Sequence, residues 1–201
     1  VNDLAVMGAK PLGLSLSFVL EEGFPKSDLK RIVATISRLS KEYKVPVVTG
    51  DTKVTEKGKL DRILVNTAGI GVADQKTLLT QKLRKGDKVL LSGGLGEHAV
   101  ALLSKRFDYE TKIVSDSKPL IKEMDAIRKM IKVAKDPTRG GIASTLNELA
   151  SKQKIGLLID EEDIPVRTEV RNVREMLGIS LYERACEGRL VCVADPRKAD
   201  S

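Results

Sequence analysis

Val45-Pro46-Val47-Val48-Thr49-Gly50-Asp51-Thr52-Lys53 is the stretch that decides how the first half of this chain folds. Its β-branched residues favour a strand, and its last four residues place polar groups at the end of that strand. Before it, residues 14–20 alternate apolar residues with Ser, which predicts a strand with one apolar face. Residues 63–72, rich in small side chains, predict another strand with close backbone packing or a bend. Between the first two strands an amphipathic helix is predicted to end near Tyr43, with an apolar stripe of Leu29, Ile32, Val33, Ile36 and Leu39.

A boundary between two domains is predicted near Lys85-Gly86-Asp87, which separates residues 1–85 from residues 86–201. The Gly93-Gly94-Leu95-Gly96 turn matches neither common phosphate-loop pattern and is interpreted as structural. Strands and helices mix without the alternation of a doubly wound sheet, so the predicted fold class is α+β in two domains. The second half predicts strands at 88–92, 156–159 and 189–194 and helices at 97–106, 119–134, 140–152 and 166–177, the last one capped by Gly178.

The composition describes a globular chain whose core is built from aliphatic side chains. Of its 201 residues 41% are hydrophobic, yet only 3% are aromatic and none is Trp. The formal net charge of +7 is spread among helices beside Glu and Asp, and no aromatic array accompanies it. A solvated surface is therefore favoured over a nucleic-acid interface. No apolar run approaches the roughly 20 residues that span a bilayer.

The first residue, the two thiols and the single His give little direct evidence of function. Val1 stands in what reads as the middle of a helix, without an initiator Met or a signal-peptide pattern, so the chain is interpreted as a piece of a longer protein. Cys186 and Cys192 make no CxxC metal site, and reduced thiols in the cytoplasm are the simpler interpretation. His98, the only His, is weak evidence for catalysis or metal binding.

Three groups of polar residues stand at the ends of predicted elements, where small-molecule sites usually form. These groups are Asn2 and Asp3; Asp51, Thr52 and Lys53; and Asp136, Thr138, Arg139 and Gly140. Asp3 and Asp51 are hard oxygen ligands, and Mg²⁺ usually takes one or two of these beside substrate phosphates. Lys53 is suited to neutralise a phosphate, and the helix start at Gly140 offers N–H groups to an anion. Glu187, at a turn before a buried strand, is a candidate general base.

Each group also has a structural interpretation. Asp3 can pair with a neighbouring Lys, Asp51 can belong to a simple turn, and Asp136-Pro137-Thr138 is an ordinary helix start. Glu187 can be an exposed turn acid. Spacing alone does not bring the groups together, so the residues by themselves leave both interpretations open.

Taken in order, these motifs resemble the HypE family of hydrogenase-maturation proteins, within the AIR synthase (PurM)-like superfamily. The resemblance extends from one end of the chain to the other. Selenophosphate synthetase and thiamine-phosphate kinase share only the looser Asp and Gly-Asp-Thr elements. The family usually has Asn before its Glu-Gly pair, where this chain has Cys186. The matching segments are residues 1–11, 50–54, 66–72, 136–141, 146–148 and 187–188.

The resemblance implies an N-terminal α/β domain that forms a barrel across a homodimer and an α+β C-terminal domain, with ATP in the cleft. The implied reaction is the ATP-dependent dehydration of an S-carbamoyl cysteine to a thiocyanate, a lyase step in making the cyanide ligand of nickel–iron hydrogenases. Lys53 and Glu187 are the implied catalytic residues, and Mg²⁺ on the triphosphate would be held by Asp3 and Asp51. The implied ATP-binding residues are Asn2, Asp3, Asp51, Thr52, Asp136, Thr138, Arg139 and Gly140.

The resemblance also implies partners, namely the carbamoyltransferase HypF and the HypC–HypD scaffold complex, and a cytoplasmic location. The family's Gly-rich N-terminal segment and its tail with the substrate Cys are absent from these 201 residues, so the piece by itself is expected not to catalyse. Two alternatives stay open. One is another ATP-using member of the superfamily, of the selenophosphate synthetase or thiamine-phosphate kinase type, and the other is a non-catalytic docking fragment.

Overall fold

The computed structural model describes residues 1–76 and 78–199, which fall into two compact units. The first unit contains Val1 and residues 9–74, and the second contains residues 2–8 and the chain from Gln75 onward. The short helix α1 (Asn2–Val6) therefore belongs to the second unit although it comes first in sequence. The predicted domain boundary at residue 85 stays a prediction.

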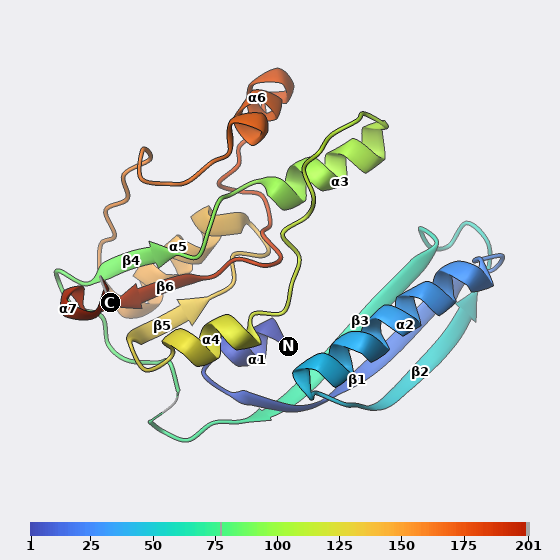
Figure 1. The fold of residues 1–201 in the computed structure, drawn as a ribbon, viewed down its shortest axis with the longest axis horizontal. Coiled ribbons are helices and arrows are strands. Elements are labelled where there is room, and N and C mark those ends of the chain that lie inside the picture. Colours follow the sequence, from blue (N-terminus) through green and yellow to red (C-terminus); the bar gives the residue numbers. More distant parts are fainter. Residues whose placement is uncertain (77, 200–201) are drawn as a thin grey trace. The chain divides into compact units, whose positions relative to one another are not determined.

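The first unit is a three-stranded sheet with one long helix (Figure 1). The central strand β1 (Lys10–Glu21) pairs in parallel with β2 (Val47–Thr55) and antiparallel with β3 (Ile63–Val72). The helix α2 (Lys26–Tyr43) connects β1 to β2 and ends at Lys44, which adopts a left-handed conformation. The predicted strands and helix of the first half are confirmed, and β1 is longer than predicted. β2 begins two residues later than predicted and runs on to Thr55, so Asp51, Thr52 and Lys53 lie inside the strand and not at its end.

Most of β2 and β3 is exposed in the single chain. Every residue from Val47 to Val54 and from Leu64 to Val72 is exposed to solvent. Keeping apolar area in water costs about 25 cal/mol per Å², so these strands favour burial of their apolar side chains. The large apolar side chains of these strands are 38–67% exposed, namely Val47, Val48, Val54, Leu64, Val65, Ile70 and Val72.

The second unit has helices on both faces of a short antiparallel sheet (Figure 1). The sheet order is β4 (Lys88–Leu91), β6 (Val191–Ala194), β5 (Ile131–Lys135). Every residue of β6 is buried, and its alternating side chains enter different cores. Cys192 and Ala194 pack with α1 and α4 (Ile121–Ile127), whereas Val191 and Val193 pack on the side of α5 (Gly141–Gln153).

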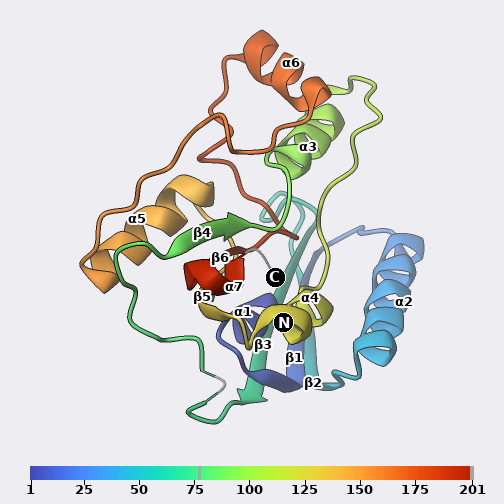
Figure 2. The ribbon, with the colours of Figure 1, turned by 60° about the vertical axis from the view of Figure 1, so that its left-hand side comes forward.

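Two further helices of this unit, α3 (Glu97–Phe107) and α6 (Thr168–Leu177), lie side by side (Figure 2). They share a small core that includes Val100, Val170 and Leu181. A Cβ on Gly96 would lie 2.6 Å from Val170 Cγ1, so the glycine-rich turn before α3 serves packing, as predicted. The last helix is α7 (Pro196–Ala199). No helix within residues 1–76 and 78–199 is long and apolar enough to cross a membrane.

Two predicted elements of the second half are wrong. The helix predicted at 119–134 is α4 followed by β5, because Ile131, Val133 and Ala134 are buried where β5 pairs with β6. The strand predicted at 156–159 is irregular chain, and Leu158 is 98% exposed. Residues 131–134 form a short apolar run whose spacing fits a helix and a strand equally well. Residues 156–159 pair with no strand of the described sheets. The predicted cap is confirmed, since Gly178 ends α6 at a φ of 61°.

Candidate functional site

Asp51, Thr52 and Lys53 lie on the exposed strand β2 of the first unit. The carboxylate Oδ1 of Asp51 accepts the N–H of Thr52 at 2.8 Å. The strand register places Ser17 between Asp51 and Asn66, so three polar residues form a row across one face of the sheet. Lys53 lies two residues further along and shares that face. Among the described residues neither Asp51 nor Lys53 makes an ion pair, so both charges are available to a ligand.

In the second unit, Asp136 follows the last residue of β5 and opens the turn into α5. The N–H of Thr138 donates to the Asp136 carbonyl, and the N–H of Gly141 donates to the Thr138 carbonyl, both at 3.0 Å. Gly140 is the N-cap of α5 with a φ of 74°, and no side chain caps the helix. The N–H groups of this helix start were predicted to bind an anion, but the N–H of Gly141 already donates to the Thr138 carbonyl. Arg139 remains exposed beside it.

Asp3 of α1 and Asp136 form a pair of like charges. Burial raises the pKa of Asp136, and the neighbouring Asp3 carboxylate raises it further. Such a pair favours a bound cation, because the cation offsets the repulsion between the two carboxylates. No group of three or more metal-ligating side chains is gathered in the described part of the chain. This donor set fits Mg²⁺, which binds one or two carboxylates together with nucleotide phosphates.

Glu187 is held through its backbone by two residues far away in sequence. Its N–H donates to Asp116 Oδ1 at 3.1 Å, and its carbonyl accepts Asn2 Nδ2 at 3.4 Å. The N–H of Cys186 donates to the carbonyl of Pro137 at 2.9 Å, which places Glu187 beside the turn after β5. The Glu187 carboxylate makes no hydrogen bond or ion pair to any described residue, so it is free to act on a ligand.

A buried charge cluster lies behind Glu187. Arg189 donates from Nε to the carbonyl of Gly94 at 2.9 Å and from Nη2 to Glu97 Oε1 at 3.3 Å. Asp116 Oδ2 lies 3.7 Å from Arg189 Nε, and the Asp116 side chain is fully buried. One oxygen of each carboxylate, Glu97 Oε2 and Asp116 Oδ2, has no hydrogen-bond partner among the described residues. A buried acceptor left without a partner costs about 1–3 kcal/mol.

The structure thus brings Asn2, Asp3, the turn at residues 136–140 and Glu187 together in the second unit, while the β2 residues form a separate group. The roles predicted for these residues stay predictions. The sequence did not indicate Asp116, Glu97 or Arg189, because charged residues in a polar loop or at a helix start carry no spacing signal. Only their burial distinguishes them.

Neither thiol belongs to an exposed reactive site. Burial raises the pKa of Cys186 and of Cys192 to about 11, and nearby Asp116 and Glu97 add to the effect at Cys186. Cys192 packs in β6. Thiolate is the nucleophilic form of cysteine, so both side chains are inert at neutral pH.

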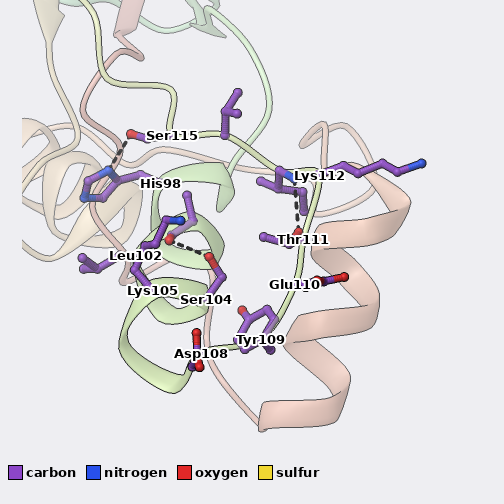
Figure 3. A pocket seen from close by; sticks show the side chains of 13 residues that line it. His98, Leu102, Ser104, Lys105, Asp108, Tyr109, Glu110, Thr111, Lys112 and Ser115 are labelled. Carbon is purple, nitrogen blue, oxygen red and sulfur yellow. Dashed lines mark hydrogen bonds between the residues drawn. The ribbon is translucent and has the colours of Figure 1, made fainter.

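His98 lines a groove of about 960 Å³ between α3 and residues 108–115 (Figure 3). Its Nδ1 lies 2.9 Å from Ser115 Oγ, and Tyr109 lines the groove farther along. None of the predicted site residues lines this groove. The candidate site is therefore distinct from it.

Comparison with family models matches both halves of the chain. Residues 1–73 match the model "AIR synthase related protein, N-terminal domain", and residues 84–201 match "AIR synthase related protein, C-terminal domain". A "Carbamoyl dehydratase HypE" of Rhizobium leguminosarum bv. viciae is 48% identical over 208 residues, which cover 100% of this chain and 59% of that protein. The protein of the same name from Cupriavidus necator is 46% identical over 207 residues, with coverage of 100% and 59%. The chain thus spans about 60% of the length of these curated relatives.

Solved structures agree with this assignment. A chain of a HypE–HypF complex superimposes with a TM-score of 0.91 at 41% identity, covering 99% of this chain and 67% of that one. A HypE structure in complex with ATP gives a TM-score of 0.93 at 37% identity, covering 99% and 61%. Thiamine monophosphate kinase from Aquifex aeolicus gives 0.80 at 20% identity, covering 98% and 70%, which shows a shared fold alone.

Proposed function

Because the chain belongs to the AIR synthase-related family and to its HypE branch, we propose that the intact protein dehydrates an S-carbamoyl cysteine to a thiocyanate with ATP. The observation that carries the proposal is the arrangement around Glu187. Its backbone is held on both sides, its carboxylate is free, and the Asp3–Asp136 acid pair lies in the same unit. A positioned base near a cation-binding acid pair suits phosphoryl transfer followed by elimination.

In the first step the carbamoyl oxygen attacks the γ-phosphorus of ATP, ADP departs, and one proton of the carbamoyl nitrogen passes to water. Asp3 and Asp51 are the residues that would hold Mg²⁺, and Asp136, beside Asp3, would add a further negative charge for the cation. Mg²⁺ would neutralise charge on the triphosphate. Lys53, free on β2, offsets charge on the transferring phosphoryl group. Arg139, exposed at the start of α5, binds phosphate oxygens with its fork of donors. The step converts a poor leaving group, an amide oxygen, into a phosphate.

In the second step Glu187 takes the remaining N–H proton while the carbon–oxygen bond breaks. Phosphate leaves with the bonding electrons, and the nitrogen lone pair completes the carbon–nitrogen triple bond. The overall conversion is S-carbamoyl cysteine plus ATP to thiocyanate, ADP and phosphate. Since both thiols of this chain are buried with a pKa of about 11, the substrate cysteine is proposed to lie in another segment or protein.

The exposed sheet of the first unit supports a homodimer. The apolar residues of β2 and β3, such as Val48 and Ile70, are 65% and 67% exposed in the single chain. Covering them with the same surface of a second copy removes that apolar area from water. HypF is a proposed partner, because a relative was solved as a HypE–HypF complex. The HypC–HypD complex and a cytoplasmic location remain proposals that rest on the resemblance.

The experiment that tests the function supplies the intact protein with ATP, Mg²⁺ and a peptide that carries an S-carbamoyl cysteine. Mass spectrometry is expected to show a peptide that has lost the mass of one water, with ADP formed in equal amount. Phosphorylation of thiamine phosphate in the parallel reaction, with the peptide unchanged, would instead establish the kinase alternative. Equilibrium dialysis with labelled ATP and Mg²⁺ tests the docking alternative, since a docking module binds neither.

The role of Glu187 has its own test. Glu187→Gln keeps the size of the side chain and removes the base, so thiocyanate formation is expected to fall by about 10²-fold or more. The Kd for ATP is expected to stay within about twofold, because the carboxylate acts on the proton and not on the nucleotide. Stopped-flow or quenched turnover gives the rate, and calorimetric titration gives the affinity. A parallel loss of both would make Glu187 a ligand of the nucleotide or its metal.

A further inference from the structure

We propose that Asp116 and Asn2 are positioning residues that hold the backbone of Glu187 and so aim its carboxylate at the reacting group. The inference deepens the proposed function and rests on the role of Glu187 as base. Neither residue is a neighbour of Glu187 in sequence, and both reach it through side chains. A base must sit within hydrogen-bond reach of its proton, so the residues that fix its backbone control the rate.

Asp116 and Asn2 bind the two backbone groups of Glu187, the N–H and the carbonyl. Asp116 Oδ1 accepts the N–H of Glu187 at 3.1 Å, and Asn2 Nδ2 donates to its carbonyl at 3.4 Å. Asn2 uses the rest of its amide on the same segment as Asp116. Its Nδ2 also donates to the carbonyl of Lys118 at 3.1 Å, and its Oδ1 accepts the N–H of Leu120 at 2.9 Å. Asn2 therefore ties α1, residues 118–120 and Glu187 into one frame.

Pairing with Arg189 is not the only contact of the Asp116 carboxylate. The guanidinium of Arg189 already donates to Glu97 at 3.3 Å, whereas Asp116 approaches it only to 3.7 Å. The Asp116 side chain is fully buried, and its Oδ2 has no hydrogen-bond partner among the described residues. A buried carboxylate that accepts a hydrogen bond from one backbone N–H is a costly anchor, and that N–H belongs to Glu187.

Gly188, the residue after Glu187, also helps to fix the backbone at this point. A Cβ on Gly188 would lie 1.8 Å from the carbonyl oxygen of Asp116, so the two backbones are in direct contact. On the other side of Glu187, the N–H of Cys186 is fixed on the carbonyl of Pro137. The backbone around Glu187 is thus immobilised while its carboxylate stays free, which is the arrangement that a positioned base requires.

The test measures kcat for thiocyanate formation and KM for ATP in the intact protein, for Asp116→Ala in the wild-type and Glu187→Gln backgrounds. In the wild-type background kcat is expected to fall at least tenfold, with KM for ATP within threefold. In the Glu187→Gln background the same change is expected to lower the residual kcat by less than twofold, because nothing remains to be positioned. Equal losses in both backgrounds would make Asp116 merely structural and overturn the proposal, as would an unchanged wild-type kcat.

Two further variants separate a positioning role from a loss of folding. Asp116→Asn keeps an acceptor for the Glu187 N–H at the same size and is expected to retain at least a third of kcat. Asn2→Ala removes the other hold and is expected to lower kcat at least fivefold, again only when Glu187 is present. If Asn2→Ala raises KM for ATP and lowers kcat in both backgrounds, Asn2 contacts the nucleotide and its positioning role is refuted. The Glu187→Gln variant alone tests the base, so full activity there refutes the proposed role of Glu187 rather than the hold.

Discussion

Replacing Gly188 by Ala tests the contact between the chain before β6 and the chain at Asp116. The new Cβ would lie 1.8 Å from the Asp116 oxygen and 2.8 Å from its carbonyl carbon, both backbone atoms that cannot rotate away. A relaxed carbon–oxygen contact needs roughly 3.3 Å, so the two segments must separate by about 1.5 Å. Overpacking costs about 1–3 kcal/mol, and breaking the hydrogen bond between Glu187 and Asp116 adds about 1–3 kcal/mol.

The expected loss in the free energy of unfolding is therefore about 2–6 kcal/mol. Urea unfolding followed by circular dichroism measures it. Gly156→Ala is the matched control, because a Cβ there meets no atom within 4 Å and its φ is not positive. That control is expected to change stability by less than about 1 kcal/mol. If the free energy of unfolding of Gly188→Ala is also within about 1 kcal/mol of wild type, Gly188 and Asp116 are not in close contact. The arrangement described around Glu187 would then be wrong.

Three further outcomes follow from the structure. Asp51→Asn in the intact protein is expected to weaken Mg²⁺-dependent ATP binding in calorimetric titration, and unchanged affinity would leave Asp51 a strand residue without a metal role. Cys186 and Cys192, with a pKa of about 11, ionise to roughly one part in a thousand at pH 8. Both are therefore expected to react with iodoacetamide only after unfolding, and fast labelling of the folded protein would contradict their burial. Because the unfolded thiols ionise near pH 9 and the folded ones near pH 11, their contribution to stability is expected to be lost between about pH 9 and pH 11. Leu120→Ala, at a fully buried core position, is expected to cost about 3 kcal/mol in urea unfolding, and a loss below about 1 kcal/mol would mean that the site collapses around the cavity.

Part of the candidate site could be predicted from the sequence, and part could not. Hydrogen bonds bring together Asn2, the turn after β5 and Glu187. The sequence predicted each of these as a candidate site, but separately. Their mutual approach depends on β5 pairing with β6, and the sequence predicted a helix over β5. Asp116, which accepts the N–H of Glu187, and Arg189, which lies 3.7 Å from Asp116, were not predicted at all.

The sequence by itself determined the elements whose period is long and unambiguous and the motifs that identify the family. The stripe of α2, the extent of β3 and the left-handed end of α6 at Gly178 are local properties, because helical spacing, β-branching and a residue without Cβ act on their own neighbours. The tertiary structure alone decided which charges are buried and what they hold. Burial is set by contacts between segments up to 185 residues apart, as between Asn2 and Glu187, and no local pattern encodes such a contact.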